Sequence, residues 1–244
     1  MRPVSPFPVP ARTVPRRPAC DHAFRALGRA EKTPGTAGDS TPTDALSTNS
    51  STCLNFARVA YLFDPDKLHD VCRRAAQQGE RGAIIDSVSA ELKHLYPAHI
   101  ELGVPWLFNN AGGAMGQIKL LHCSLSEYIL IFGTPSGTEG HSGRYATEVF
   151  DFMLDGEMWC FHAGEFERTI FKPGDLAYLG ADRAKGYAVP SDVLMLEYAR
   201  GPIPTMLPFG LADTVFSTHD PRTIGGTLFQ YARLVTQNLL RGKI

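Results

Sequence analysis

One acidic residue interrupts an apolar run near position 195. In "DVLMLEYARG", residues 192–201, the side chains of Val193, Met195 and Glu197 share one face of a predicted strand, because side chains alternate along a strand. The run is apolar on both faces, as is typical of a strand that is covered on both sides. Burial without a partner would raise the pKa of Glu197 by ~3–5 units. This carboxyl group therefore needs a partner or a chemical use.

A second acidic residue, Asp151, lies in another apolar run, "VFDFML". Taken alone, either acid is explained by a structural ion pair with Arg144 or Arg200. Two such acids in one small β structure indicate a different role. If Asp151 and Glu197 meet, they share one proton, because two adjacent carboxyl groups cannot both ionise cheaply. Such a pair can deliver a proton or hold a cation.

The strand that begins near residue 127 supplies a candidate third group. Tyr128 alternates with Leu130 and Phe132, so its phenol is predicted to face the same interior. Core packing is the alternative for this tyrosine. The predicted wall of the site consists of Tyr128, Leu130, Phe132, Met153 and Met195.

Other chemistries have less support in the sequence. His122, His141 and His162 are isolated and form no HxH pair, so we expect no metal site. The segment "NNAGGAMG" matches neither the dinucleotide fingerprint nor the P-loop. Ser142 directly follows His141 in "GHSGRY", which is typical of a glycine-flanked turn rather than a catalytic triad. We expect no metal and no cofactor.

Composition excludes several classes of protein. The 244 residues, 43% of them apolar, can bury one substantial core. The net charge of −1 gives no reason to expect nucleic acid as a partner. Five scattered cysteines without a CxxC pair indicate neither a disulfide framework nor a zinc knuckle. No stretch approaches the ~18 consecutive apolar residues of a membrane-spanning helix, and the N-terminus lacks the apolar core of a secretory signal.

The sequence divides into four segments, and the folded ones must position the acidic pair. Residues 1–55 are predicted to be a disordered, basic tail rich in Pro, Ser and Thr, with a transit peptide as the alternative. Residues 56–103 form a helical arm, in which Asp64 is a plausible N-cap. Residues 104–201 are rich in strand formers, and residues 202–244 return to helical spacing.

Turn signals divide the β-rich segment into short strands. The run "SEYILIFGTP" predicts a strand that ends at a Gly-Thr-Pro turn. Asp155–Gly156 is a favoured two-residue turn and predicts a hairpin. Short strands at this spacing favour a sandwich or a small barrel.

The last segment has the pattern of a membrane-surface helix. No acidic residue follows Asp220, whereas basic residues do. A helix packed on the β structure is the alternative, but the preceding apolar stretch favours a membrane face. The predicted stripe consists of Ile224, Leu228, Tyr231, Val235 and Leu239.

Several long motifs together resemble one known family. The stretches "NNAGGAMG", "LLHCSLSEYILIFGTPSGTEGHSGRY", "LEYARGPIP" and "GLADTVFST" are similar to those of sterol Δ8–Δ7 isomerases and the sigma-1 receptor. The resemblance covers roughly residues 61–244. The "GTPSGTEGH" loop and the closing "NLLRGKI" resemble the isomerase branch, and Ala114 stands where the receptor's "GGWMG" has tryptophan.

The resemblance implies a fold and a location. It implies an α+β fold, with a cupin-like β-barrel flanked by N-terminal helices and by two C-terminal helices on the endoplasmic reticulum membrane. Members commonly form homotrimers and usually begin with a membrane-spanning helix, which this sequence does not show. The family's carboxylate pair matches Glu197 and Asp151, and Tyr128 also matches a site position.

The implied reaction moves a sterol double bond from Δ8 to Δ7. A proton adds at carbon 9, a tertiary cation develops at carbon 8, and a proton leaves carbon 7. This needs an acid, an anion and a dry apolar interior, and neither metal nor redox cofactor. Cationic amines would then act as inhibitors. A non-catalytic receptor for cationic amphiphiles remains the alternative. The expected substrate contacts are completed by Tyr145, Ile203, Met206 and Leu207.

Overall fold

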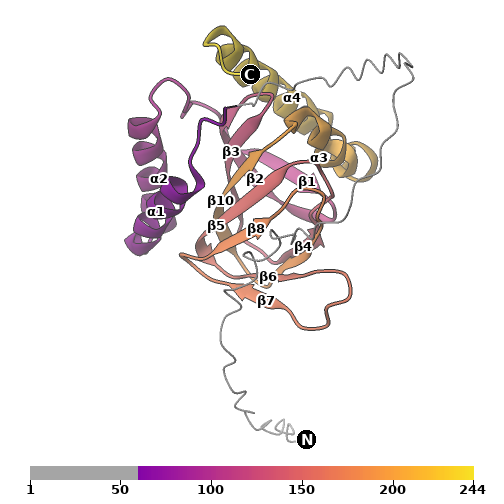
Figure 1. Cartoon of the computed structure of the whole chain (residues 1–244). Coiled ribbons are helices and arrows are strands. Elements are labelled where there is room, and N and C mark those ends of the chain that lie inside the picture. The colour runs from indigo at the N-terminus through magenta and orange to yellow at the C-terminus, as the bar shows by residue number, and fades with distance from the viewer. Residues whose placement is uncertain (1–59) are drawn as a thin grey trace, which may run out of the picture. The chain divides into compact units, whose positions relative to one another are not determined.

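The computed structural model describes residues 60–244, and the tail predicted over 1–55 lies outside this part. Figure 1 shows a β-rich centre with α1 and α2 against one side, and with α3 and α4 close together elsewhere on it. The helices are α1 (Pro65–Ala75), α2 (Arg81–Leu95), α3 (Leu207–Asp213) and α4 (Pro221–Leu240), with the 3₁₀ turns η1 (Ala76–Gln78) and η2 (Ile203–Met206) and the π-helical turn η3 (Thr214–Thr218).

Six strands form the larger sheet, in the spatial order β1–β2–β3–β10–β5–β8. Their bounds are β1 (Leu107–Ala111), β2 (Ala114–Cys123), β3 (Glu127–Thr134), β10 (Val193–Arg200), β5 (Glu148–Gly156) and β8 (Leu176–Leu179). All neighbours in this sheet are antiparallel. Because β10 lies between β3 and β5, the strand predicted near residue 195 is central. One of its faces packs in the cluster with α1 and α2 and the other in a second buried cluster, which explains its apolar residues on both faces.

Four short strands form the second sheet, in the order β4–β9–β6–β7. Their bounds are β4 (Thr138–His141), β9 (Gly186–Val189), β6 (Met158–Phe161) and β7 (Thr169–Phe171). Side chains of both sheets line one cavity. The α+β class is confirmed, although the strands pair within two separate sheets and the hydrogen-bonded ladder does not close.

The prediction of a hairpin at Asp155–Gly156 is wrong. Strands β5 and β6 follow each other in the chain but belong to different sheets. Gly156 still pairs with Val193 of β10 and has a positive φ of 81°. A Cβ at this position would lie 2.2 Å from the carbonyl oxygen of Asp192. The glycine therefore lets the chain turn from one sheet to the other beside a crowded strand.

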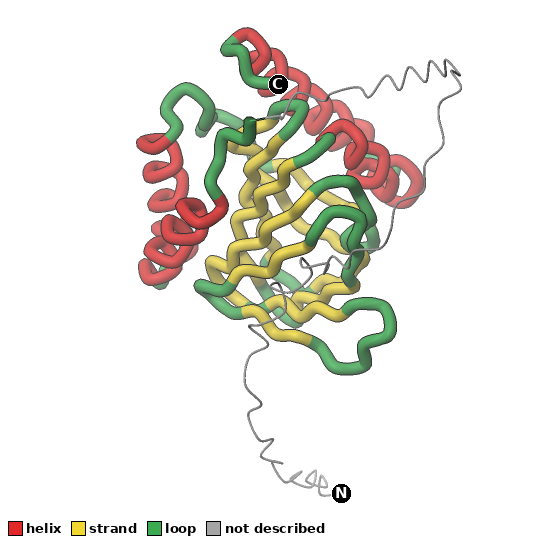
Figure 2. Tube along the Cα trace, in the orientation of Figure 1, coloured by secondary structure: helices red, strands yellow, loops and turns green. Residues whose placement is uncertain are grey.

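Helices α1 and α2 cover the outer face of the larger sheet, as Figure 2 shows. The predicted N-cap is confirmed, because the side chain of Asp64 accepts a hydrogen bond of 3.0 Å from a backbone N–H two residues later. In α2, Ile84, Val88 and Leu92 are buried against the sheet. Leu95, in the last turn of the helix, is exposed.

Helix α4 packs on β1 and β2, so its predicted apolar stripe is divided. Val235 is buried and Tyr231 is half-buried against the core, whereas Leu228 and Leu239 are exposed. The prediction that the whole stripe faces a membrane is therefore wrong. Residues spaced by three and four share a helix face, but the buried residues of α4 are Leu234, Val235 and Asn238, and Leu228 and Leu239 lie outside this face.

Candidate active site

Strand β10 presents its two faces to different parts of the core. Leu196 and Tyr198 join the cluster beneath α1 and α2. Met195 joins the cluster on the opposite side of the sheet. Glu197 points to that same side and lines the cavity. The alternation predicted from the sequence is confirmed.

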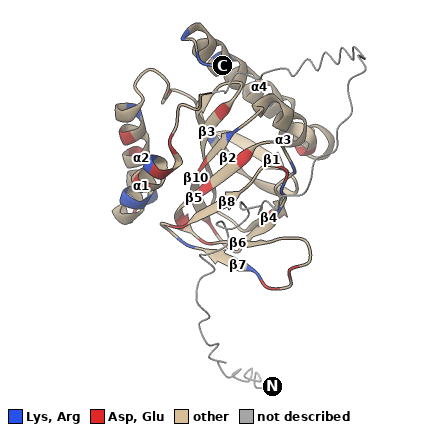
Figure 3. Cartoon of the chain, viewed as in Figure 1, with Lys and Arg blue, Asp and Glu red and all other residues tan. Residues whose placement is uncertain are grey.

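Asp151 lies directly beside Glu197, because the register of β5 and β10 pairs these two positions. Residues paired in this way have Cβ atoms about 4.5–5.5 Å apart. Asp151 also lines the cavity and is buried. Figure 3 shows acidic residues, in red, on the central strands of the larger sheet. The structure therefore brings the two predicted acids together on one face.

The two carboxyl groups have different hydrogen-bond partners. The hydroxyl group of Tyr128 donates to Oε1 of Glu197. Nζ of Lys185 lies 2.6 Å from Oδ2 of Asp151, and both of these side chains are buried. The pair is thus asymmetric: one acid faces a phenol and the other a cation.

The alternative interpretation of either acid was a structural ion pair with Arg144 or Arg200. One acid does form an ion pair, but its partner is a lysine. Asp151 pairs with Lys185. Arg200 pairs with Glu148 at 2.7 Å, and Arg144 donates to a backbone carbonyl oxygen. The ion pair and the acidic pair therefore coexist.

Burial and neighbouring charges shift the pKa values in this group. Burial and, after it, the charge of Asp151 raise the pKa of Glu197 to about 7, against the opposing effects of Tyr128 and Lys185. Burial lowers the pKa of Lys185, but the Asp151 carboxylate and its neighbours more than offset this and raise it overall. Burial and the charge of Glu197 raise the pKa of Tyr128 well above its usual value. Near neutral pH, Glu197 is the acid that can both hold and release a proton.

A cavity of about 210 Å³ extends from this group. A single water needs only ~10–15 Å³ on the same measure, so the cavity has room for an organic ligand. Its wall is mainly apolar, which suits a lipid-like molecule. Eight predicted contact residues lie in this wall: Tyr128, Leu130, Phe132, Tyr145, Met195, Ile203, Met206 and Leu207.

Met153 is the predicted contact residue that does not line the cavity. It is fully buried in the cluster on the cavity side of the sheet. The second sheet contributes to the same cluster, and Met158 of β6 takes a place in the wall instead. Sequence alternation gave the correct face of the strand, but not which side chain another sheet would cover.

Sequence reasoning missed several residues of the cavity. Lys185 is the most important of them, because it supplies the only cation in the cavity wall among the described residues. Its signal in the sequence was a lone charge directly before the apolar strand "GYAV". Tyr187 of that strand, Phe209 of α3 and Tyr231 of α4 also line the cavity, so the C-terminal helices form part of its wall.

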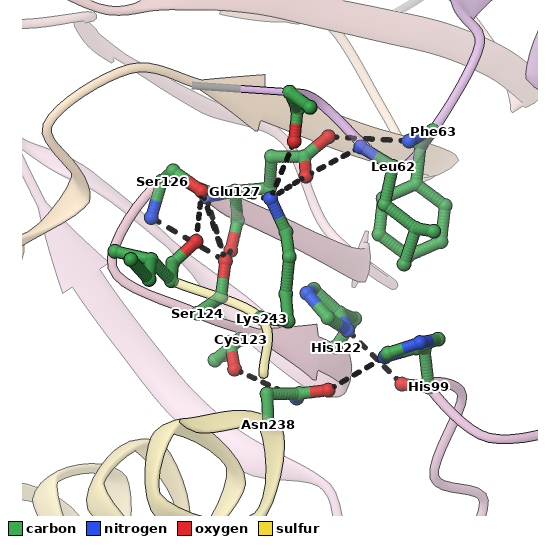
Figure 4. Close-up of polar contacts among 12 residues, drawn as sticks. Leu62, Phe63, His99, His122, Cys123, Ser124, Ser126, Glu127, Asn238 and Lys243 are labelled. Atoms are coloured by element: carbon green, nitrogen blue, oxygen red, sulfur yellow. Dashed lines mark hydrogen bonds and ion pairs between the residues drawn. The ribbon is translucent and has the colours of Figure 1, made fainter. Parts of the chain in front are cut away.

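A third buried carboxylate, Glu127, lies on the other face of the same sheet (Figure 4). Its Oε2 accepts a hydrogen bond of 2.8 Å from the Leu62 N–H and lies 2.6 Å from Nζ of Lys243. Its Oε1 accepts from the Phe63 N–H at 3.2 Å and from the Tyr198 hydroxyl at 2.6 Å. This fully partnered carboxylate joins β3 to both the N-terminal and the C-terminal described segments.

The fold and the cavity define an α+β protein in which two antiparallel sheets enclose an apolar cavity with an acidic pair on one wall. The chain belongs to the family described as "ERG2 and Sigma1 receptor like protein", whose sequence model matches residues 45–243. The resemblance seen in the motifs is thereby confirmed.

Relatives within this family carry a shared name. The chain is 42% identical over 186 residues to "C-8 sterol isomerase erg2" of Aspergillus fumigatus, covering 75% of this chain and 78% of that protein. It is 39% identical over 186 residues to "C-8 sterol isomerase ERG2" of Gibberella zeae, covering 75% and 79%. It is 43% identical over 155 residues to "Protein erg2 homolog" of Dictyostelium discoideum, covering 64% and 66%.

Likeness to solved structures is weaker. An RmlC-like cupin from Shewanella frigidimarina shares 15% identity at a TM-score of 0.36, covering 43% of this chain and 90% of that one.

Proposed function

We propose that this protein is an intramolecular isomerase that moves the sterol double bond from Δ8 to Δ7 in sterol biosynthesis. One observation carries the proposal: two adjacent carboxyl groups, Glu197 and Asp151, open into an apolar cavity. The names of the relatives, C-8 sterol isomerases, agree with it. A general acid is most effective when its pKa lies near the working pH, and the pKa of Glu197 is raised to about 7.

In the proposed reaction, Glu197 gives its proton to carbon 9 of the sterol. The double-bond electrons form the new C–H bond, and a tertiary cation develops at carbon 8. The negative charge that proton transfer leaves on the acidic pair stabilises this cation in a site of low polarity, where charge interactions are strong. The C–H bond at carbon 7 then breaks, its electrons form the Δ7 double bond, and its proton restores the acid form of the pair. No electrons enter or leave, so the reaction needs no cofactor.

Expression in a yeast strain that lacks sterol isomerase tests this function. Restored Δ7 sterols in the lipid extract are the expected result, and the Glu197→Gln variant made to the same level is the matched control. Unchanged Δ8 sterols would instead favour a non-catalytic receptor of the sigma-1 type. Both functions predict binding of cationic amines, which resemble the carbon 8 cation, so amine binding alone does not separate them.

We also propose that the protein works on the surface of the endoplasmic reticulum membrane. Among the described residues, no helix is both long enough and apolar enough to cross a bilayer. Large apolar side chains are nevertheless exposed near the C-terminal end, on η3 and α4 and beyond: Val215, Phe216, Leu228, Phe229, Leu239, Leu240 and Ile244. Exposed apolar groups on a helix can insert into the lipid interface.

Vesicle binding tests the membrane proposal. The variant Phe216→Ser/Phe229→Ser/Leu240→Ser should lose most of its binding to phosphatidylcholine vesicles while its melting temperature stays unchanged. Phe166→Ser is a matched control, because Phe166 is fully exposed on the segment between β6 and β7. Equal vesicle binding of wild type and triple variant would contradict the proposal.

A homotrimer is proposed from the family resemblance. Light scattering of the detergent-solubilised protein should give a protein mass about three times that of one chain. A mass equal to one chain would contradict it.

A further inference from the structure

Lys185 is held rigidly at the edge of the cavity. Its N–H donates to the Ser142 hydroxyl at 2.9 Å, and its carbonyl oxygen accepts from the Ser142 N–H at 3.0 Å. Its side chain is 6% exposed and its ammonium group lies 2.6 Å from Asp151. Two backbone links and one ion pair therefore fix a cation inside a mainly apolar cavity.

The cavity holds few other charges. The titratable groups that line it are Asp151 on β5, Glu197 on β10, Lys185, His141 at the end of β4, the thiol of Cys123 on β2, and the phenols of Tyr128, Tyr145, Tyr187 and Tyr231; the Cys160 thiol on β6 also influences Lys185. His141 also lies in the wall, and its Nδ1 accepts a hydrogen bond of 3.0 Å from the Gly143 N–H. Burial keeps the two thiols and the four phenols protonated, because it disfavours their charged forms.

We propose that Lys185 is a built-in counter-cation, which cancels the charge of Asp151, leaves Glu197 as the single proton donor, and makes the cavity uncharged when Glu197 is protonated. The inference rests on the proposed isomerase function and divides the roles within its acidic pair. An uncharged cavity accepts a neutral sterol. It becomes anionic only after Glu197 has given its proton away, which is the moment when the sterol becomes a cation.

This arrangement predicts how a cationic ligand depends on pH. An ammonium ion can pair only with ionised Glu197, because Lys185 already occupies Asp151. Below the pKa of Glu197, ammonium binding must release the Glu197 proton, so affinity falls by up to about tenfold for each pH unit. If Lys185 were absent, Asp151 would remain free to hold the ammonium ion at lower pH.

The probe is N,N-dimethyldodecylamine, with dodecan-1-ol as its neutral counterpart, measured by calorimetry in detergent on the full chain. At about pH 6, Lys185→Met should bind the amine at least tenfold more tightly than wild type, and its affinity should vary little up to about pH 8. Lys185→Arg retains the cation and should keep the pH dependence of wild type. The double variant Lys185→Met/Asp151→Asn lacks both charges and should regain that dependence. Lys172→Met is the matched control, because Lys172 makes an exposed ion pair at 3.6 Å.

If Lys185→Met fails to fold, a comparison of amine and alcohol binding in wild type and Glu197→Gln tests whether Lys185 neutralises Asp151. At about pH 6, wild type should prefer the amine over the alcohol by less than about threefold, and by much more at about pH 8. Glu197→Gln should show no preference at either pH. A preference for the amine of tenfold or more in Glu197→Gln would show that Asp151 is not neutralised and would overturn the proposal. So would unchanged amine binding in a folded Lys185→Met variant.

Turnover separates this inference from the function on which it rests. Lys185→Met should also lose isomerase rate, and the pH above which its rate falls should move upward, because the uncompensated charge of Asp151 makes Glu197 a weaker acid. If wild type has no isomerase activity, the proposed function fails while the amine measurements still test the charge of the site. If wild type turns over sterol and Lys185→Met keeps its rate and pH profile, only the role of Lys185 fails.

Discussion

The same dipeptide, Glu-Tyr, occurs on two neighbouring strands, and its side chains make different contacts on the two faces of the sheet. Glu127–Tyr128 begins β3, and Glu197–Tyr198 lies in β10. Because successive side chains point to opposite faces, Tyr128 donates to Glu197 on the cavity face, and Tyr198 donates to Glu127 on the outer face. Two Tyr–Glu pairs therefore lie back to back across one sheet.

The two glutamates differ in their remaining partners. Glu127 receives two backbone N–H groups and the ammonium group of Lys243, so its charge is satisfied within the protein. Glu197 receives the phenol of Tyr128 and lies beside a second acid, Asp151. A buried carboxylate with many donors stabilises structure, whereas one with few donors keeps a shifted pKa and is available for chemistry.

The largest expected effect is on the cavity side. Glu197→Gln keeps the shape of the side chain but removes the proposed proton donor, so turnover should fall by roughly 10²–10⁴-fold. Asp151→Asn should be nearly as severe, and the double variant little worse, because groups that act as one unit are not additive. Sterol conversion per folded protein is the measurement. Near-normal turnover in a folded Glu197→Gln protein would remove Glu197 from the mechanism.

The matching change on the outer face should affect stability instead. Glu127→Gln breaks the ion pair with Lys243 and leaves that ammonium group uncompensated, which destabilises the protein by about 3–5 kcal/mol. The melting temperature should fall by roughly 2–4 °C for each kcal/mol. Turnover below the melting temperature should stay within about threefold of wild type. A loss of turnover without a loss of stability would contradict the division between the two faces.

The two tyrosines give a finer version of the same test. The hydrogen bond from Tyr128 lowers the pKa of Glu197, so Tyr128→Phe should raise that pKa further. In the proposed mechanism the acid form of Glu197 is the active one, so the rate of wild type should fall as pH rises through about 7. In Tyr128→Phe this fall should occur at higher pH. Tyr198→Phe should leave the pH profile unchanged and reduce stability by ~1.5–3 kcal/mol. Identical pH profiles for both variants and wild type would contradict the assignment.

The smallest expected effect is the pH dependence of stability. The pKa of Glu197 is raised to about 7 in the folded protein, from an ordinary value of 4.5. The folded state therefore binds this proton more tightly than the unfolded state, and the stabilisation is present below the ordinary pKa and is lost as pH rises through about 7. Glu197→Gln should thus melt at a higher temperature than wild type above that pH, and at a similar temperature near pH 4.5. A lower melting temperature at every pH would indicate a purely structural role.

Much of the fold was predictable because its signals are local. The N-cap at Asp64 and the alternation along β10 depend on residues a few positions apart, and both predictions are confirmed. The prediction of a hairpin at Asp155–Gly156 was wrong because a glycine with positive φ fits both a hairpin turn and a bend from one sheet to the other. Which of these forms depends on strands that are distant in sequence.

The sequence by itself determined which residues are chemically unusual. Glu197 and Asp151 were identifiable because a carboxyl group in an apolar strand is costly wherever that strand lies. The sequence also determined the face of its own strand to which each side chain points, but the pairing of β3 with β10 was needed to bring Tyr128 to Glu197.

Only the tertiary structure decided the roles of these groups. Lys185 is 34 residues from Asp151, and Lys243 is far from Glu127 in the chain. No local pattern predicts which distant cation will meet which carboxylate. The pKa of a buried acid depends on charges within a few ångströms of it. Two identical Glu-Tyr dipeptides therefore differ in role only because folding gave each glutamate different neighbours. Glu127 stabilises the structure, and Glu197 is a candidate proton donor.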